Sequence, residues 1–163
     1  MNACGTCTMC CKLLGISDLA PRKPVNQWCR HCKPGNGCTI YEDRPRSCRE
    51  FECLWLQSQT KPHPMGPELR PDKSKVVIAP TSSPNVMTAF VDPAQPLAWR
   101  EGGMKRILER LAKIDVRVVI SLGISTRKTL IEKHGGAIRE RTITMSDPDE
   151  SGMQWYDPMN QSE

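Results

Sequence analysis

The sequence has no cysteine after Cys53, few aromatic residues and no long apolar run. Aromatic side chains make up only 5% of the 163 residues, so we do not expect a large hydrophobic core. No stretch approaches the roughly 20 apolar residues that a membrane-spanning helix needs, and a membrane is therefore not an expected partner. The first residues lack the basic and apolar segments of a secretory signal, which predicts a cytoplasmic protein.

All nine cysteines lie within the first 53 residues. In a reducing compartment disulfides are rare, and clustered cysteines there indicate metal binding or redox chemistry. The same segment has few large apolar side chains and is rich in proline and glycine. A structural metal contributes roughly 10 kcal/mol or more to the folding of zinc-finger peptides, enough to replace a missing core. We therefore predict a metal-stapled cysteine module over residues 1–53.

The cysteines fall into three groups with the spacing of metal ligands. Two cysteines three residues apart turn both sulfur atoms toward one point, as in zinc knuckles and iron–sulfur proteins. Sites with four thiolates hold either zinc or an iron–sulfur cluster, so the spacing leaves open the metal, the number of sites and any spare cysteine. The predicted metal ligands are Cys4, Cys7, Cys10 and Cys11 in the first group, Cys29, Cys32 and Cys38 in the second, and Cys48 and Cys53 in the third.

Two segments carry a family resemblance: CGTCTMCCK at residues 4–12 and GCTIYEDRPRSCREFEC at residues 37–53. They resemble the CxxCxxCC family of zinc- or iron-chelating domains, also described as cysteine-cluster proteins. The resemblance covers about 50 of the 163 residues and implies metal chelation. It also implies that Cys32 is the extra thiol, although spacing alone pairs Cys32 with Cys29. The implied ligands are Cys4, Cys7, Cys10, Cys11, Cys29, Cys38, Cys48 and Cys53.

Two other functions stay open at this point. One is a metal-dependent enzyme, methyltransferase-like or redox, because a flagellin lysine methylase is similar in its cysteine cluster. However, no glycine-rich loop follows a strand in the way that would hold S-adenosylmethionine, and no acid or base stands at a suitable spacing. The other is a zinc-knuckle interaction module. Scattered basic residues and few aromatics argue against nucleic acid as its partner, so a metal ion is the expected partner.

The rest of the chain predicts a small α+β unit. Residues 54–74 are expected to form a linker, because four prolines interrupt any continuous helix or strand. Within residues 75–145, apolar runs predict strands at 75–80, 86–91 and 116–122, and helical spacing predicts an amphipathic helix at 103–114.

Two segments near the C-terminus complete the prediction. Either residues 125–134 form a helix ending at Gly135-Gly136 or, as we prefer, residues 128–131 form a strand that pairs with residues 137–144. Residues 146–163 have five acidic and no basic residues, and we expect a disordered or loosely docked tail that Trp155 and Tyr156 pin to the body. The predicted fold is thus α+β: a metal-stapled, loop-rich cysteine module on a small antiparallel sheet with one main helix.

Overall fold

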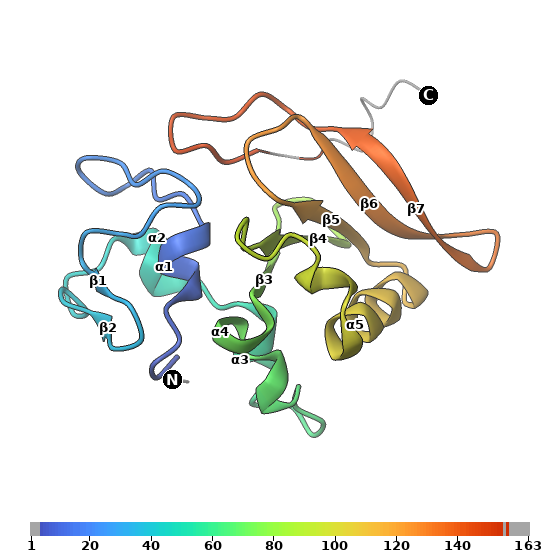
Figure 1. The fold of residues 1–163 in the computed structure, drawn as a ribbon, viewed down its shortest axis with the longest axis horizontal. Helices are drawn as coiled ribbons and strands as arrows, with labels where there is room; N and C mark the ends of the chain where they lie inside the picture. Colours follow the sequence, from blue (N-terminus) through green and yellow to red (C-terminus); the bar gives the residue numbers. More distant parts are fainter. Residues whose placement is uncertain (1–3, 155, 157–163) are drawn as a thin grey trace.

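The structure of the protein, a computed structural model, describes residues 4–154 and Tyr156. Its centre is a five-stranded sheet with the strand order β3-β4-β5-β6-β7 (Figure 1). β4 and β5 are parallel, and the other neighbouring strands of this sheet are antiparallel. The strands are β3 (Val76–Pro80), β4 (Val86–Val91), β5 (Arg117–Ser121), β6 (Arg127–His134) and β7 (Ala137–Thr144).

The parallel pair corrects the prediction of an antiparallel sheet. Parallel neighbours need a crossover connection, and the chain makes it through the short helix η2 (Ala98–Arg100) and the main helix α5 (Gly102–Lys113). The apolar residues of α5 recur at helical spacing, so that Met104 and Leu108 are buried against the sheet. The mixed helix-and-sheet architecture with one main helix is confirmed.

The C-terminal strands form a hairpin closed by Gly135 and Gly136. Both glycines have positive φ angles, 56° and 85°, which a two-residue hairpin turn of this kind requires. Residues Arg127 to His134 pair in register with Thr144 to Ala137. The strand prediction for this segment is confirmed, and the alternative of a helix is wrong.

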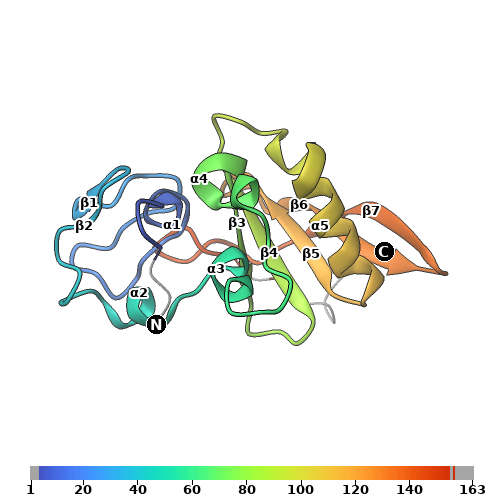
Figure 2. The ribbon, with the colours of Figure 1, turned by 90° about the horizontal axis from the view of Figure 1, so that it is seen from below.

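The two faces of the sheet are covered by different parts of the chain. Helix α5 packs on one face, where it meets apolar residues of β3 to β6 (Figure 2). On the other face, α1 (Met9–Leu13) and α3 (Leu54–Ser58) pack on Val77, while Met145 and Tyr156 pack on Val119 and its neighbours. No helix in residues 4–154 has the length and hydrophobicity needed to cross a membrane.

The proline-containing segment 54–74 adds short helices to the body. They are α3, the single-turn helix η1 (Pro67–Leu69) and α4 (Pro71–Ser74). Pro67 and Pro71 each open a helix, the position where a missing N–H group costs nothing. Leu56 and Leu69 are buried, so this segment contributes to the hydrophobic core as well as connecting the module to the sheet.

The cysteine module lies beside β3 at one side of the sheet (Figure 1). Its described part, residues 4–53, contains mostly loops, and its regular elements are α1, the two-stranded antiparallel sheet of β1 (Cys32–Lys33) and β2 (Gly37–Cys38), and α2 (Arg46–Glu50). Of these, α1 packs on the sheet with Met9 and Leu13. The module therefore shares one hydrophobic cluster with the body.

An ion pair also joins the module to the sheet. The ammonium group of Lys12 donates to both carboxylate oxygens of Asp92, each at 2.8 Å, and Asp92 directly follows β4. The side chain of Asp92 is only 8% exposed. Burial raises the pKa of Asp92, but hydrogen bonds from Lys12 and from the Ala94 amide outweigh it, so the pKa lies below its ordinary value. The carboxylate is therefore charged in the folded protein at neutral pH.

The C-terminal segment forms a third connection between the module and the body. Ser151 is 1% exposed, and its carbonyl accepts a hydrogen bond of 2.9 Å from the Val25 amide. The Asp149 carboxylate accepts hydrogen bonds from the Ser151 amide and hydroxyl, which fixes this turn. Of the segment expected to be disordered or loosely docked, the turn at residues 149–152 is thus held against the module. Tyr156 is buried as predicted, and Trp155 lies outside the described residues.

The Lys12–Asp92 pair gives a pH-dependent prediction. Replacing Asp92 with Asn should lower the free energy of unfolding by about 1–3 kcal/mol at pH 7, because Lys12 loses its charged partner. A carboxyl group with a lowered folded-state pKa stabilises the protein above its ordinary pKa and loses that effect as the pH falls through the lowered value. The difference between wild type and Asp92→Asn should therefore disappear in acid. Denaturant unfolding between pH 7 and pH 2 measures it, with the exposed Asp43→Asn as control; a difference that does not depend on pH contradicts the prediction.

A pair of glycine variants tests the docking of the C-terminal segment. A Cβ atom on Gly15 would lie 2.6 Å from the Ser151 carbonyl oxygen, whereas a Cβ atom on Gly123 has nothing nearer than 4.0 Å. Gly15→Ala should therefore cost about 1–3 kcal/mol of stability, and Gly123→Ala much less. Limited proteolysis should cleave the chain after Met145 faster in Gly15→Ala alone. Equal cleavage and equal stability of the two variants would mean that the segment is not held against Gly15.

Candidate functional site

The structure gathers the nine predicted ligands in one part of the molecule, and all nine are free thiols. They come from every element of the module and from its loops. Cys10 and Cys11 lie in α1, Cys48 lies in α2 and Cys53 immediately precedes α3. Cys32 and Cys38 face each other across the β1–β2 pair. Cys29 and Cys53 are buried, and Cys4 is exposed.

Cys11 is at the centre of the arrangement. Its thiol shares hydrogen bonds with the thiols of Cys10 and Cys32. The hydrogen bond with Cys10, together with burial, raises the pKa of Cys11. Burial and the neighbouring Cys11 raise the pKa of Cys32 to about 12. Without a bound cation, the sulfur atoms of Cys11 and Cys32 are therefore protonated at neutral pH.

Thr8 holds Cys32 in this arrangement. Its side chain is buried, and its hydroxyl accepts a hydrogen bond of 3.1 Å from the Gly35 amide. The same hydroxyl donates to the Cys32 sulfur, which lowers the pKa of that thiol against the larger effect of burial. Thr8 thus ties the β1–β2 turn to the start of α1 and directs a donor at a sulfur atom. Thr8 directly precedes α1, but its side chain makes no cap bond to that helix.

A second set of thiols lies around Cys4. Although Cys4 is an exposed residue, partial desolvation of its thiol and the nearby thiols of Cys53, Cys7 and Cys11 raise its pKa to about 11, and Arg44 acts in the opposite direction. Burial also raises the pKa of Cys7, although the amides of Met9 and Asp72 are directed at its sulfur and lower it in part. Amide groups aimed at sulfur favour the thiolate form, as they do around metal-bound cysteines.

Cys53 receives the same kind of support from α3. Burial raises its pKa, and the amides of Leu56 and Trp55, in the first turn of that helix, partly reverse the rise. The free amides at a helix N-terminus favour a negative charge at this position. Both Cys7 and Cys53 therefore have backbone donors in place for a thiolate.

Lys23 is buried among the remaining thiols. It is only 4% exposed, and its ammonium group donates to the carbonyls of Lys12 and Leu14 at the end of α1. Burial lowers the pKa of Lys23 to about 8, while the nearby Cys11, Cys29, Cys10 and Cys48 act to raise it. Within the described residues, Lys23 forms no ion pair with a carboxylate. The thiols are thus the groups that can supply a compensating negative charge.

Asp18 holds the start of α2, the helix that contains Cys48, one of the thiols near Lys23. Its carboxylate accepts a 3.0 Å hydrogen bond from the Ser47 amide and a 2.5 Å hydrogen bond from the Ser47 hydroxyl, which anchors the start of α2. Burial raises the pKa of Cys48, and the Ser47 side chain lowers it in part. Cys11 and Cys29 act electrostatically on Cys48, so this thiol belongs to the set around Lys23.

Two thiol sets follow from these interactions. One contains Cys4, Cys7 and Cys53; the other contains Cys10, Cys29, Cys32 and Cys48; Cys11 interacts with members of both. In residues 4–154 and 156, no three cysteine, histidine or acidic side chains converge closely enough to form a finished metal-binding group. The donor chemistry suits a thiophilic metal, and coordination requires the sulfur atoms to turn toward a common centre.

The sequence did not indicate Thr8, Lys23 or the amides that face Cys7 and Cys53. Lys23 lies between Arg22 and Pro24 and resembles an ordinary surface cation. Its position depends on the antiparallel bridge between Ile16 and Lys23, which folds the chain back on α1. No local pattern around residue 23 predicts that contact.

Comparisons of the chain with protein-family models, with curated proteins and with solved structures found no match in any of the three.

Proposed function

We propose that the cysteine module binds a metal centre, either zinc or an iron–sulfur cluster, through its clustered thiols. The ligands are drawn from Cys4, Cys7, Cys10, Cys11, Cys29, Cys32, Cys38, Cys48 and Cys53. A bound centre of this kind supplies a positive charge that stabilises several thiolates at once and joins the loops of the module. It gives the module a stability that its few apolar side chains do not provide.

The buried ammonium group of Lys23 is the observation that carries this proposal. A buried charge without a partner costs several kcal/mol, and two backbone carbonyls offset only part of that cost. Protonated thiols are neutral and offset none of it. Four thiolates around one divalent ion have a net charge of about −2. The positive charge of Lys23 offsets part of this negative charge, and the negative charge in turn stabilises the buried ammonium group. The geometry around Lys23 therefore suits an anionic metal–thiolate centre better than a set of neutral thiols.

The sulfur environment gives further support. Backbone amides face the sulfur atoms of Cys7 and Cys53, and the Thr8 hydroxyl faces that of Cys32. Each of these donors favours a thiolate over a thiol. Because the thiolate is the form that binds metal, the donors lower the cost of releasing protons when the metal binds. Zinc and an iron–sulfur cluster would use them in the same way.

Metal analysis tests the proposal. The protein, purified anaerobically under reducing conditions, should contain at least one zinc ion or one iron–sulfur cluster per chain. Zinc, iron and acid-labile sulfide are measured together with the visible spectrum. A colourless zinc protein indicates structural knuckles, and a brown protein with iron and sulfide indicates a cluster. Metal-free protein that is folded, with nine reduced thiols and a protease-resistant module, would rule out the proposal.

Lys23 provides a sharper variant test. Lys23→Met keeps the length and apolar character of the side chain and removes its charge, so metal affinity should fall about 10–100-fold, as for other groups that support metal ligands. Lys33→Met removes the same charge from an exposed position of the same module and should leave affinity unchanged. Affinity is measured by competition with a chelator at equilibrium, with circular dichroism as a check on folding. Equal affinities of wild type and Lys23→Met would show that Lys23 does not compensate the centre.

A further inference from the structure

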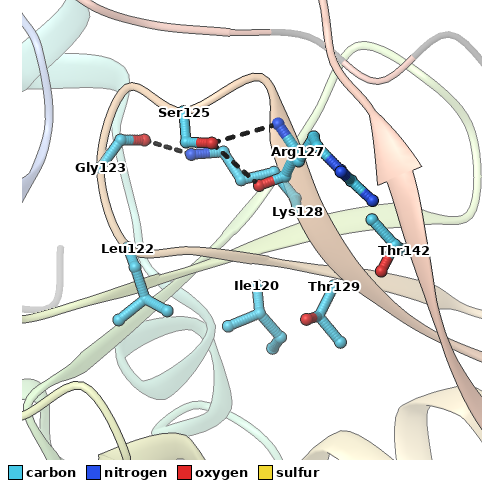
Figure 3. Close-up of a pocket in the computed structure, with 8 residues that line it drawn as sticks. All are labelled: Ile120, Leu122, Gly123, Ser125, Arg127, Lys128, Thr129 and Thr142. Carbon is cyan, nitrogen blue, oxygen red and sulfur yellow. Dashed lines mark hydrogen bonds between the residues drawn. The ribbon is translucent and has the colours of Figure 1, made fainter.

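A cavity of about 430 Å³ opens at the end of β5, and no cysteine is among the residues that line it (Figure 3). One wall of the cavity is a row of side chains across β5, β6 and β7. In this row Ile120 pairs with Thr129, and Thr129 pairs with Thr142. Residues paired directly across a sheet point to the same face, and so do residues two apart along a strand. Leu122 and Arg127 therefore extend the same row toward the strand ends.

The loop between β5 and β6 forms another wall. Lys128 is 6% exposed, and its ammonium group donates to the Gly123 carbonyl, which closes the loop (Figure 3). Ser125 accepts a hydrogen bond of 3.3 Å from the Arg127 amide and holds the start of β6. These contacts give the cavity a defined wall on the loop side.

The chemistry of the lining selects the ligand. Two basic residues, Arg127 and Lys128, line the cavity, and none of its lining residues is acidic. In the described part of the chain, the guanidinium group of Arg127 forms no hydrogen bond or ion pair, and the hydroxyls of Thr129 and Thr142 form no hydrogen bond. Ile120 and Leu122 supply apolar surface beside them, and Leu122 is 39% exposed. An unpaired guanidinium beside two free hydroxyls is a site for a carboxylate or phosphate group.

The position of the cavity in the fold agrees with this assignment. β4 and β5 are the parallel pair of the sheet, joined through α5. In open α/β sheets, ligands bind outside the carboxyl ends of parallel strands, and this cavity lies at the corresponding end of β5. Leu122 and Gly123 directly follow β5 at that end. Helix α5 covers Ile120 and Ile131 on the same face, and the cavity lies where Ile120 adjoins Thr129.

We propose that this cavity binds a small amphipathic anion, with its carboxylate or phosphate group on Arg127, Thr129 and Thr142 and its apolar part on Ile120 and Leu122. The volume suits a molecule at the small end of the usual range for ligand pockets. The site is separate from the thiols, so the inference does not depend on the proposed metal centre.

The test uses the full chain as purified, labelled with ¹⁵N. Hexanoate and hexyl phosphate are titrated separately, and amide chemical shifts are followed. At least one of the two should give saturable shifts that centre on residues 120–129 and on Thr142, and the tighter of the two identifies the head group. Hexanol lacks the charge and inorganic phosphate lacks the apolar part, so each should bind at least tenfold more weakly than that amphiphile.

Variants decide whether Arg127 holds the anion. Arg127→Gln should weaken binding at least tenfold, and Thr142→Val, which keeps the shape and removes the hydroxyl, should weaken it about threefold to tenfold. Arg110→Gln removes the same charge from the exposed side of α5 and should bind like wild type. All three positions are at the surface or free of side-chain bonds, and unchanged amide spectra elsewhere verify the fold. The absence of saturable binding, shifts centred outside this cavity, or undiminished binding by Arg127→Gln would each overturn the proposal.

Discussion

The desolvation of one ammonium group constrains the whole cysteine module. Lys23 is brought inside by its bridge to Ile16, and its ammonium group satisfies two carbonyls at the end of α1. These carbonyls accept hydrogen bonds but have no net charge, so the remaining charge must be balanced by what surrounds it. What surrounds it is sulfur from four cysteines of three different segments. Either the lysine is neutral or nearby sulfur is anionic, and the proposed metal centre would supply the anionic sulfur.

The module and the sheet are joined at three places with different chemistry. Met9 and Leu13 bury apolar surface on Val77, Lys12 pairs with Asp92, and Ser151 packs against Gly15 and Val25. The first two contacts both come from the short helix that also contains Cys10 and Cys11. That helix has five residues and would not be stable alone. Its position, and with it the position of two sulfur atoms, therefore depends on the body of the protein.

The sequence predicted the local elements well where one residue pattern dominates. The apolar runs at residues 76–80, 86–91 and 117–121 and the helical spacing in α5 led to the correct elements, and Gly135-Gly136 fixed the hairpin. The parallel pairing of β4 with β5 was missed, because strand order depends on where α5 packs and no local pattern encodes it. The spacing of the cysteines predicted them as candidate ligands, but it did not predict which groups surround their sulfur atoms. Thr8 meets Gly35 across 27 positions and Lys12 meets Asp92 across 80, and such long-range contacts have no signature in the sequence.

The C-terminal segment lies between the module and the loop that forms a wall of the cavity. Gly152 has a φ of 83°, and a Cβ atom there would lie 2.8 Å from Val25 and 3.5 Å from Ile124. Only glycine combines that backbone with so close an approach. Val25 belongs to the module, and Ile124 belongs to the loop that forms a wall of the cavity. The segment thus occupies the space between them, so that the module is attached to the sheet while the face containing Arg127 and Thr142 is left open.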